Sequence, residues 1–331
     1  MTEGTVNAAG QVTPEMTRQY FELFANRLAY TVQFRTPAPN GKHYYYRPKD
    51  GRRLTLETLR EHLNGQHTIG LYALNPRTQR CKWVAIDADY ENALEDLLKL
   101  QWELSKAGVE AALEKSRRGA HLWIFAEKPL LAKDCRIYIY NLALSLKVPV
   151  KGGGRLAEGI EIFPRQNQIA PGEFGNGIRG PLGVHRATGK RYWFYGAAYD
   201  TGAQLEYLLR LRKITEAELL SFINALEMPE EFQPRPKLEL PPYDPSRREF
   251  HILDHVRPAR KRSGNYWGRC PSCSQQGNDR SGDNLAISVA DPRKYRCWAG
   301  CTKEMIRAAL GQPIRTQRSG DHAISTQTRK I

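Results

Sequence analysis

A short apolar run that ends in two aspartates constrains this chain more than any other stretch of it. Residues 83–86 have the composition of a buried strand, and Asp87 and Asp89 follow directly. Strand side chains alternate between faces, so Asp87 and Asp89 are predicted to point the same way. Two neighbouring carboxylates repel each other unless a cation lies between them. Taken alone, the pattern is more typical of a strand that ends in a solvated loop. A cation site at Asp87 and Asp89 is the better interpretation only if the surrounding sequence supports it.

The chain is strongly basic. Its 331 residues contain 50 Lys and Arg against 35 Asp and Glu, a formal charge of +15. This excess indicates a polyanionic partner, nucleic acid before an anionic membrane. Residues 250–331 hold 15 of the cations and 6 of the acids, so this part is the stronger candidate for polyanion binding. No run approaches the roughly 20 apolar residues of a membrane span, and we expect a cytoplasmic, nucleoid-associated protein without a membrane partner.

Strand-like and helix-like segments alternate along the first two thirds of the chain. This pattern predicts an α/β (α+β) fold, a mixed sheet covered by helices, with a small cysteine-containing module after it. Residues 91–106 are predicted to be a helix with one apolar stripe, formed by Leu94, Leu97, Leu98 and Trp102. The expected organisation is a large domain at 1–228 (core 68–195, closing helices 201–228), a proline-rich linker at 229–249, the module at 250–312 and a disordered tail at 313–331.

Four of the six cysteines form two pairs late in the chain. Cys270 and Cys273 are separated by 23 residues from the second pair, Cys297 and Cys301. Such spacing is typical of a tetrahedral Zn²⁺ site made of thiolates, and four unrelated free thiols are the weaker interpretation. Because the protein fills all four positions, the zinc is expected to be structural, and its binding would fold the module.

A basic, glycine-containing turn leads into a strand soon after the aspartates. Ser116, Arg118, Gly119 and His121 lie in or directly after this turn. A hydroxyl, a guanidinium and an imidazole at one turn can hold phosphates. A surface turn with a structural histidine is the alternative interpretation of the same residues.

Two later segments also carry polar groups of interest. Glu161 stands between two isoleucines and therefore faces away from what they bury; an exposed strand glutamate explains it equally well by itself. Residues 175–194 are rich in glycine, which lets a backbone approach a ligand closely. Their cations include Arg179, His185 and Lys190, which can meet phosphates or template or can be the solvated charges of a hairpin.

Residues 42–53 mix a histidine and three consecutive tyrosines with five Lys and Arg. Aromatic rings among cations can stack on bases and contact phosphates. A plain β-hairpin with solvated charges is the favoured interpretation of this stretch.

Taken in order, these segments resemble the archaeo-eukaryotic primase superfamily, the primase-polymerases, in the form found in mobile elements and conflict systems. That superfamily has an Asp-x-Asp/Glu motif on one strand, a Ser/Gly-x-His motif on the next and a third acidic residue on a later strand. Any one motif is weak, but four in the right order across residues 68–195 are specific. The matching segments after the aspartates are Gly119-Ala-His121-Leu-Trp-Ile-Phe125, Phe163-Pro-Arg-Gln166 and Gly175-Asn-Gly-Ile-Arg-Gly-Pro-Leu182.

The resemblance implies that Asp87 and Asp89 bind catalytic Mg²⁺ or Mn²⁺, with Glu161 as the third acid. Related sequences often carry Asp at the third position, and Glu158 and Glu173 are the alternative candidates there. The nucleotide contacts implied by the same resemblance are Ser116, Arg118, Gly119, His121, Arg165, Gln166, His185 and Lys190.

The cysteine module resembles the zinc-binding domain of bacterial and phage primases, which binds single-stranded template. In that family the second ligand is usually His, whereas Cys273 stands here, and the metal site should tolerate this change. The aromatic side chains can instead cover the small core of a zinc ribbon. The implied template contacts are Trp267, Arg269, Tyr295, Arg296 and Trp298.

The predicted function is that of a DNA-templated primase-polymerase, which synthesises primers on single-stranded DNA and extends them by two-metal nucleotidyl transfer. Its expected partners are single-stranded DNA, nucleoside triphosphates, and a helicase or other replication proteins. Two alternatives are a non-catalytic single-strand DNA-binding or replication-initiator protein and a gap-filling repair polymerase that cannot prime.

Overall fold

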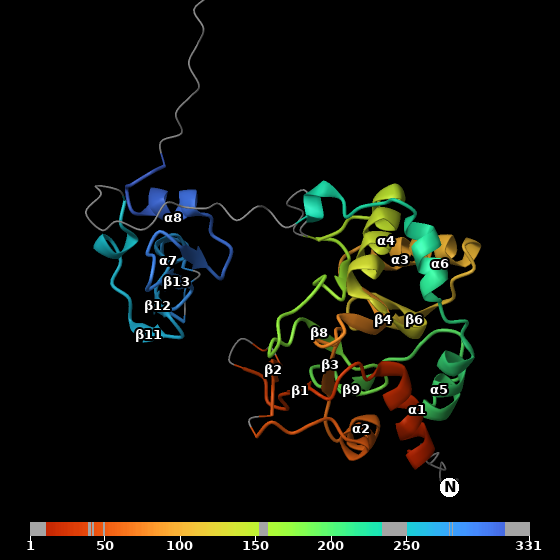
Figure 1. The fold of residues 1–331 in the computed structure, drawn as a ribbon. Helices are drawn as coiled ribbons and strands as arrows, with labels where there is room; N and C mark the ends of the chain where they lie inside the picture. Colours follow the sequence, from red (N-terminus) through yellow and green to blue (C-terminus); the bar gives the residue numbers. More distant parts are fainter. Residues whose placement is uncertain are drawn as a thin grey trace, which may run out of the picture. The chain divides into compact units, whose positions relative to one another are not determined.

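The computed structural model describes residues 11–38, 41, 43–48, 50–151, 158–233, 250–277, 279 and 281–314 (Figure 1). The chain divides into two compact units, Met1–Arg235 and Pro236–Ile331. Most of the predicted linker at 229–249 and of the predicted tail at 313–331 lies outside the described residues. The domain limits given above therefore stay predictions.

Two four-stranded antiparallel sheets form the centre of the first unit. The first sheet has the order β2-β1-β3-β8, with β1 at Tyr30–Gln33, β2 at Tyr45–Tyr46, β3 at Ile69–Tyr72 and β8 at Gly177–Arg179. The second has the order β5-β6-β4-β7, with β4 at Arg80–Ala88, β5 at Ala111–Lys115, β6 at Ala120–Leu131 and β7 at Glu161–Phe163. A short hairpin adds β9 at Val184–His185 and β10 at Lys190–Arg191.

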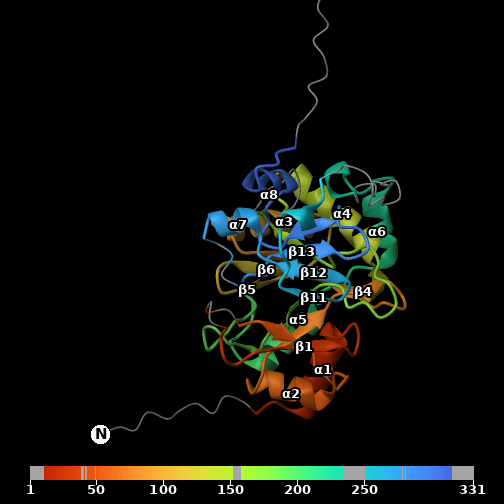
Figure 2. The ribbon, with the colours of Figure 1, turned by 90° about the vertical axis from the view of Figure 1, so that its left-hand side faces the viewer.

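Helices cover both sides of this arrangement, so the predicted α/β class is confirmed (Figures 1 and 2). Three helices pack on the outer face of the second sheet: α3 (Ala93–Lys106), α4 (Ala132–Ser145) and α6 (Glu216–Ile223). The other three helices form a second group, in which α1 (Pro14–Phe24) packs against both α2 (Leu56–Leu63) and α5 (Thr201–Arg210). Thr215 and Glu218 form a capping box at the start of α6.

Strand β4 is buried on both faces. Val84 and Ile86 belong to the core beneath α3 and α4, whereas Trp83 and Ala85 belong to the core shared with the first sheet. This alternation is the period of two expected of a strand. Asp87 continues the face of Trp83 and Ala85, so its carboxylate comes at the end of an apolar row on the side of the first sheet.

Helix α3 buries a different stripe from the predicted one. Leu97, Leu100 and Leu104 are fully buried against the second sheet. Of the predicted stripe, only Leu97 is buried, while Leu94, Leu98 and Trp102 are exposed to solvent. Apolar residues occupy two faces of this helix, and the face with the leucines at 97, 100 and 104 is the one that meets the strands.

The second unit is a small sheet with two short helices. Its four antiparallel strands follow the order β11-β12-β13-β14, and its core joins Ile252, Leu285, Ile287 and Ile306 to the cysteines. The elements are β11 (Arg260–Arg262), β12 (Asn265–Gly268), α7 (Pro271–Gln275), β13 (Leu285–Ser288), β14 (Tyr295–Cys297) and α8 (Lys303–Ala309). In the part of the chain that the structure describes, no helix is long and apolar enough to cross a membrane.

We expect Leu122→Ala to destabilise the first unit by about 2–5 kcal/mol, because Leu122 is fully buried in β6 and its truncation leaves a cavity. Denaturant unfolding measures the change. Leu94→Ala, at an exposed position of α3, is the matched control and should stay within about 0.5 kcal/mol of the parent. Equal losses in the two variants would contradict the assignment of this core.

Candidate functional site

Four polar side chains form a row across the second sheet. The pairing register places Glu114 of β5 opposite His121 of β6, His121 opposite Asp87 of β4, and Asp87 opposite Glu161 of β7. Residues that are directly opposite in an antiparallel sheet have their Cα atoms about 4.5–5.5 Å apart. Three sequence-predicted residues, Asp87, His121 and Glu161, are thus neighbours on adjacent strands.

His121 lies between two carboxylates. Its Nδ1 is 2.8 Å from Oε2 of Glu114, and its Nε2 is 3.4 Å from Oδ1 of Asp87. Burial of the ring opposes its charge, but the carboxylates of Glu114 and Asp87 outweigh burial and raise the pKa of His121 to about 9. An imidazolium therefore stands between the two acids at neutral pH.

Glu114 anchors this imidazolium from inside the protein. Its side chain is completely buried, and it accepts hydrogen bonds from Nε1 of Trp123 at 3.0 Å and from Nη2 of Arg179 at 2.6 Å. Burial alone would raise the pKa of Glu114, but the charges of Arg179 and His121 outweigh it and lower this pKa. Arg179 belongs to β8, so the ion pair joins the two sheets.

Sequence reasoning missed the role of Glu114. It ends a run that reads as an ordinary strand, and no motif marks it. The signal that identifies it is the pairing of β5 with β6, which follows from tertiary structure. Arg179, predicted to meet phosphates or template, is instead largely buried against Glu114.

Asp89 follows the end of β4 and contacts the predicted phosphate-binding turn. It forms an ion pair with Arg118 and accepts a 3.4 Å hydrogen bond from Oγ of Ser116. Ser116 Oγ also accepts the backbone N–H of Gly119 at 3.1 Å. A Cβ at position 119 would lie 1.9 Å from the carbonyl oxygen of Ala88, so only glycine fits beside β4 here.

All three predicted metal-binding acids lie against basic side chains. Glu161 contacts Lys151, and its Oε2 accepts a hydrogen bond from Nη1 of Arg165 at 3.0 Å. Asp89 is held by Arg118, as described above. Asp87 lies against His121, whose Nε2 is 3.4 Å from its buried Oδ1, and this oxygen makes no hydrogen bond to a described residue. A buried carboxylate oxygen without a donor fits a cation ligand.

The remaining predicted nucleotide contacts lie farther along the chain. Gln166 and Asn176 hydrogen bond to each other, which ties two of the predicted motifs together. His185 and Lys190 are opposite each other in the β9–β10 hairpin. Burial, with help from Arg179 and then Arg117, lowers the pKa of His185 to about 4, so this ring is neutral.

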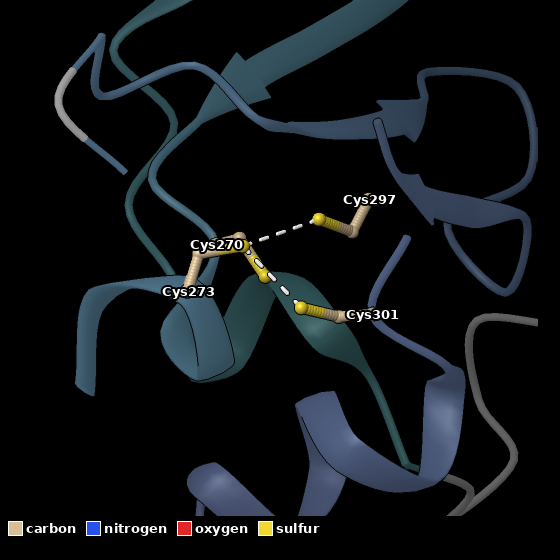
Figure 3. A group of neighbouring side chains, drawn as sticks. All are labelled: Cys270, Cys273, Cys297 and Cys301. Atoms are coloured by element: carbon tan, nitrogen blue, oxygen red, sulfur yellow. Dashed lines mark hydrogen bonds between the residues drawn. The ribbon is translucent and has the colours of Figure 1, made fainter. Parts of the chain in front are cut away.

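The four late cysteines converge in the second unit (Figure 3). Their Sγ atoms all lie within 4.8 Å of one another, and Sγ of Cys273 is 3.5 Å from Cys297 and 3.3 Å from Cys301. Burial raises the pKa of Cys270 to about 11, so a thiolate there needs a cation. Four sulfurs at this separation fit a tetrahedral Zn²⁺ ion. Among the described residues, no other group of three or more His, Cys, Asp or Glu gathers in this way.

Of the five predicted template contacts, four lie at the surface of the second unit, and Tyr295 lies in its core. The rings of Trp267 and Trp298 are parallel within 10°, with centroids 6.2 Å apart, and the guanidinium of Arg296 lies 4.9 Å from the Trp298 ring. Arg269 is exposed, whereas Tyr295 is buried in the small core.

Residues 11–222 match the family described as "TOTE conflict system, Archaeo-Eukaryotic Primase domain", and the chain belongs to this family, as predicted. A search of curated proteins finds no match. Among solved structures, the polymerase domain of Ligase D from Mycobacterium tuberculosis, in complex with DNA, is similar at 12% identity. The match covers 67% of this chain and 94% of that chain, with a TM-score of 0.27.

We expect Glu114→Gln to destabilise the first unit by about 3–5 kcal/mol, because Arg179 would stay buried without its charged partner. Denaturant unfolding tests this, with Glu110→Gln as the control, because Glu110 is exposed and directly precedes β5. The double variant Glu114→Gln/Arg179→Met should recover part of the loss. If Glu110→Gln and Glu114→Gln unfolded alike, the buried ion pair would not have this role.

Removal of zinc should unfold the second unit and leave the first unit intact, since the cysteine cluster is part of the core of the second unit alone. Hydrogen exchange after chelation should show loss of protection in β12–β14 and unchanged protection in β4 and β6. The variant Cys135→Ala, in the first unit, should keep one zinc per chain, whereas Cys297→Ala should lose it. Persistent protection of β12–β14 after complete chelation would refute the site.

Proposed function

We propose that this protein is a DNA-templated primase-polymerase that synthesises primers on single-stranded DNA and extends them. The observation that carries the proposal is the row of Asp87, His121 and Glu161 on adjacent strands, with a buried oxygen of Asp87 that has no described hydrogen-bond donor. Membership of the archaeo-eukaryotic primase family supports the reaction class.

Asp87, Asp89 and Glu161 are the residues that would hold Mg²⁺ or Mn²⁺, since carboxylate oxygens suit both ions. Two such ions, when bound, lower the pKa of the attacking 3′-hydroxyl and neutralise the leaving pyrophosphate. Their carboxylate oxygens do not gather as the cysteine sulfurs do, and each acid faces a basic side chain: Asp87 faces His121, Asp89 faces Arg118 and Glu161 faces Arg165. Metal binding would replace these contacts.

His121 and the turn before it would bind the nucleotide's triphosphate. Glu114 accepts from Nδ1 of His121 and so fixes the ring, which leaves the Nε2–H to donate on the side of Asp87. Beside Asp89, the turn offers the hydroxyl of Ser116 and the guanidinium of Arg118. Gly119 lets the backbone of this turn pack closely against Ala88. Donors fixed before the reaction stabilise charge in the transition state at little cost in reorganisation. The further nucleotide contacts we propose are Arg165, Gln166, His185 and Lys190.

The second unit would bind the template. The stacked pair of Trp267 and Trp298 suits unpaired bases, with Arg269 and Arg296 for phosphates, while Tyr295 would support them from the core. Zinc would have a structural role there. A template contact that does not depend on a primer favours strand initiation, and a helicase or other replication proteins at the nucleoid would supply the single strand.

The double variant Asp87→Asn/Asp89→Asn should lose about 100-fold or more of the nucleotide incorporation, because charged ligands are removed with little change of shape. The assay supplies single-stranded DNA, with and without a primer, and labelled ribo- or deoxyribonucleotides with Mg²⁺ or Mn²⁺. Glu91→Gln, an exposed acid just after the motif, is the matched control and should keep the parent's rate.

Comparison of the products on primed and unprimed template distinguishes the possible activities. Product on both templates supports a primase-polymerase, and product on the primed template alone identifies a gap-filling polymerase. Binding of DNA with no product in any tube identifies a non-catalytic binding protein. Unchanged incorporation by the double variant would overturn the assignment of the acidic residues.

A further inference from the structure

Three aromatic side chains are exposed at one edge of the first sheet. Phe34, Tyr44 and Tyr46 expose 47%, 50% and 40% of their surface, and we name them the aromatic edge. The rings of Phe34 and Tyr46 are in contact, with centroids 4.4 Å apart and planes inclined by 37°. Large exposed rings that gather in one place mark a binding surface more often than scattered ones do.

Backbone pairing places these three rings on one face. Val32 is opposite Tyr46, and the backbone N–H of Phe34 donates to the carbonyl of Tyr44 at 2.9 Å. Side chains alternate along each strand, so Phe34, Tyr44 and Tyr46 share a side. Strand β2 is the outermost strand of its sheet (Figure 1), and no other strand among the described residues pairs with its outer edge.

The segment of the chain that contains the aromatic edge carries mostly positive charges. Residues 35–53 contain six Lys and Arg and a single acid, Asp50. Asp50 is paired with Arg52 through a 2.5 Å contact, and both side chains are exposed. Arg53 is also exposed, one residue farther on. A polyanion fits this surface better than a protein or an apolar ligand does, because the exposed rings lie in a segment with six cations and one acid.

Tyr45, between Tyr44 and Tyr46, points to the opposite face of the sheet. A Cβ on Gly70 would lie 3.3 Å from Cδ1 of Tyr45, so the ring lies over this glycine. Gly70 is opposite Arg179, which reaches Glu114 at the end of the polar row. Aromatic surface is therefore present on both faces of β2, one of which leads toward the candidate active site.

We propose that the aromatic edge binds single-stranded DNA, with bases stacked on Phe34, Tyr44 and Tyr46 and phosphates near Arg52 and Arg53. Every base has a π-face, so such a surface holds a strand without regard to its sequence. This contact lies in the first unit and is separate from the tryptophan pair of the second. The inference rests on the proposed function for its ligand, the template strand, and adds a second place where that strand is held.

The experiment measures the binding of full-length protein to fluorescent oligo(dT) by anisotropy, without nucleotides or a primer. Phe34→Ala/Tyr44→Ala/Tyr46→Ala should bind about fivefold or more weakly, as the loss of one stacked base predicts. Trp102→Ala is the matched control, because Trp102 is 67% exposed on α3, beyond the cationic segment, and its loss should not change binding. Arg53→Gln should lower the slope of log K against log salt by about 0.7.

Thermal unfolding checks that the variants are folded, and Arg53→Gln tests the surface even if the triple variant is not. A photoreactive oligo(dT) should cross-link to peptides within residues 34–46. Parent-like binding by the triple variant and an unchanged salt slope for Arg53→Gln would overturn the proposal, as would cross-links confined to the second unit. Nucleotide incorporation by the parent, assayed separately, shows whether the proposed function itself fails.

Discussion

The structure of the first unit depends on a group of charges that are buried together. Glu114 has no exposed surface, and it satisfies His121, Arg179 and Trp123 at once. Loss of one member would leave another charge buried without a partner, which costs several kcal/mol, whereas the complete set is tolerated. Because Arg179 comes from the first sheet and the others from the second, this network fixes how the two sheets face each other.

The same network prepares the polar row for chemistry. Glu114 holds one nitrogen of His121, so the ring cannot turn away from Asp87. Asp87 lies at the end of an otherwise apolar face, and the basic group nearest to its buried oxygen is Nε2 of His121, 3.4 Å away. Asp89 is more exposed and pairs with Arg118, while Glu161 on β7 pairs with Lys151 and Arg165. One strand thus carries acids in two different electrostatic environments.

Motif order and spacing made much of the site predictable. Asp87, His121 and Glu161 were expected on three different strands, and the register makes them neighbours. The four cysteines followed from spacing alone. Glu114 was not predictable, because a strand residue without a motif reveals its partners only when the strands pair. Helix α3 shows a second limit: apolar residues line two of its faces, and periodicity cannot tell which one meets the sheet.

Gly119 has a consequence for how this region can vary. The carbonyl of Ala88 fills the space in which any other residue would place its first side-chain carbon. Even alanine would push the basic turn off the strand that carries Asp87, and the separation of Arg118 from Asp89 would grow with it. Because position 119 has no room for a side chain, Gly119 sets the distance between the basic turn and strand β4. Larger side chains and insertions in this turn are tolerable only on its outer side, away from β4.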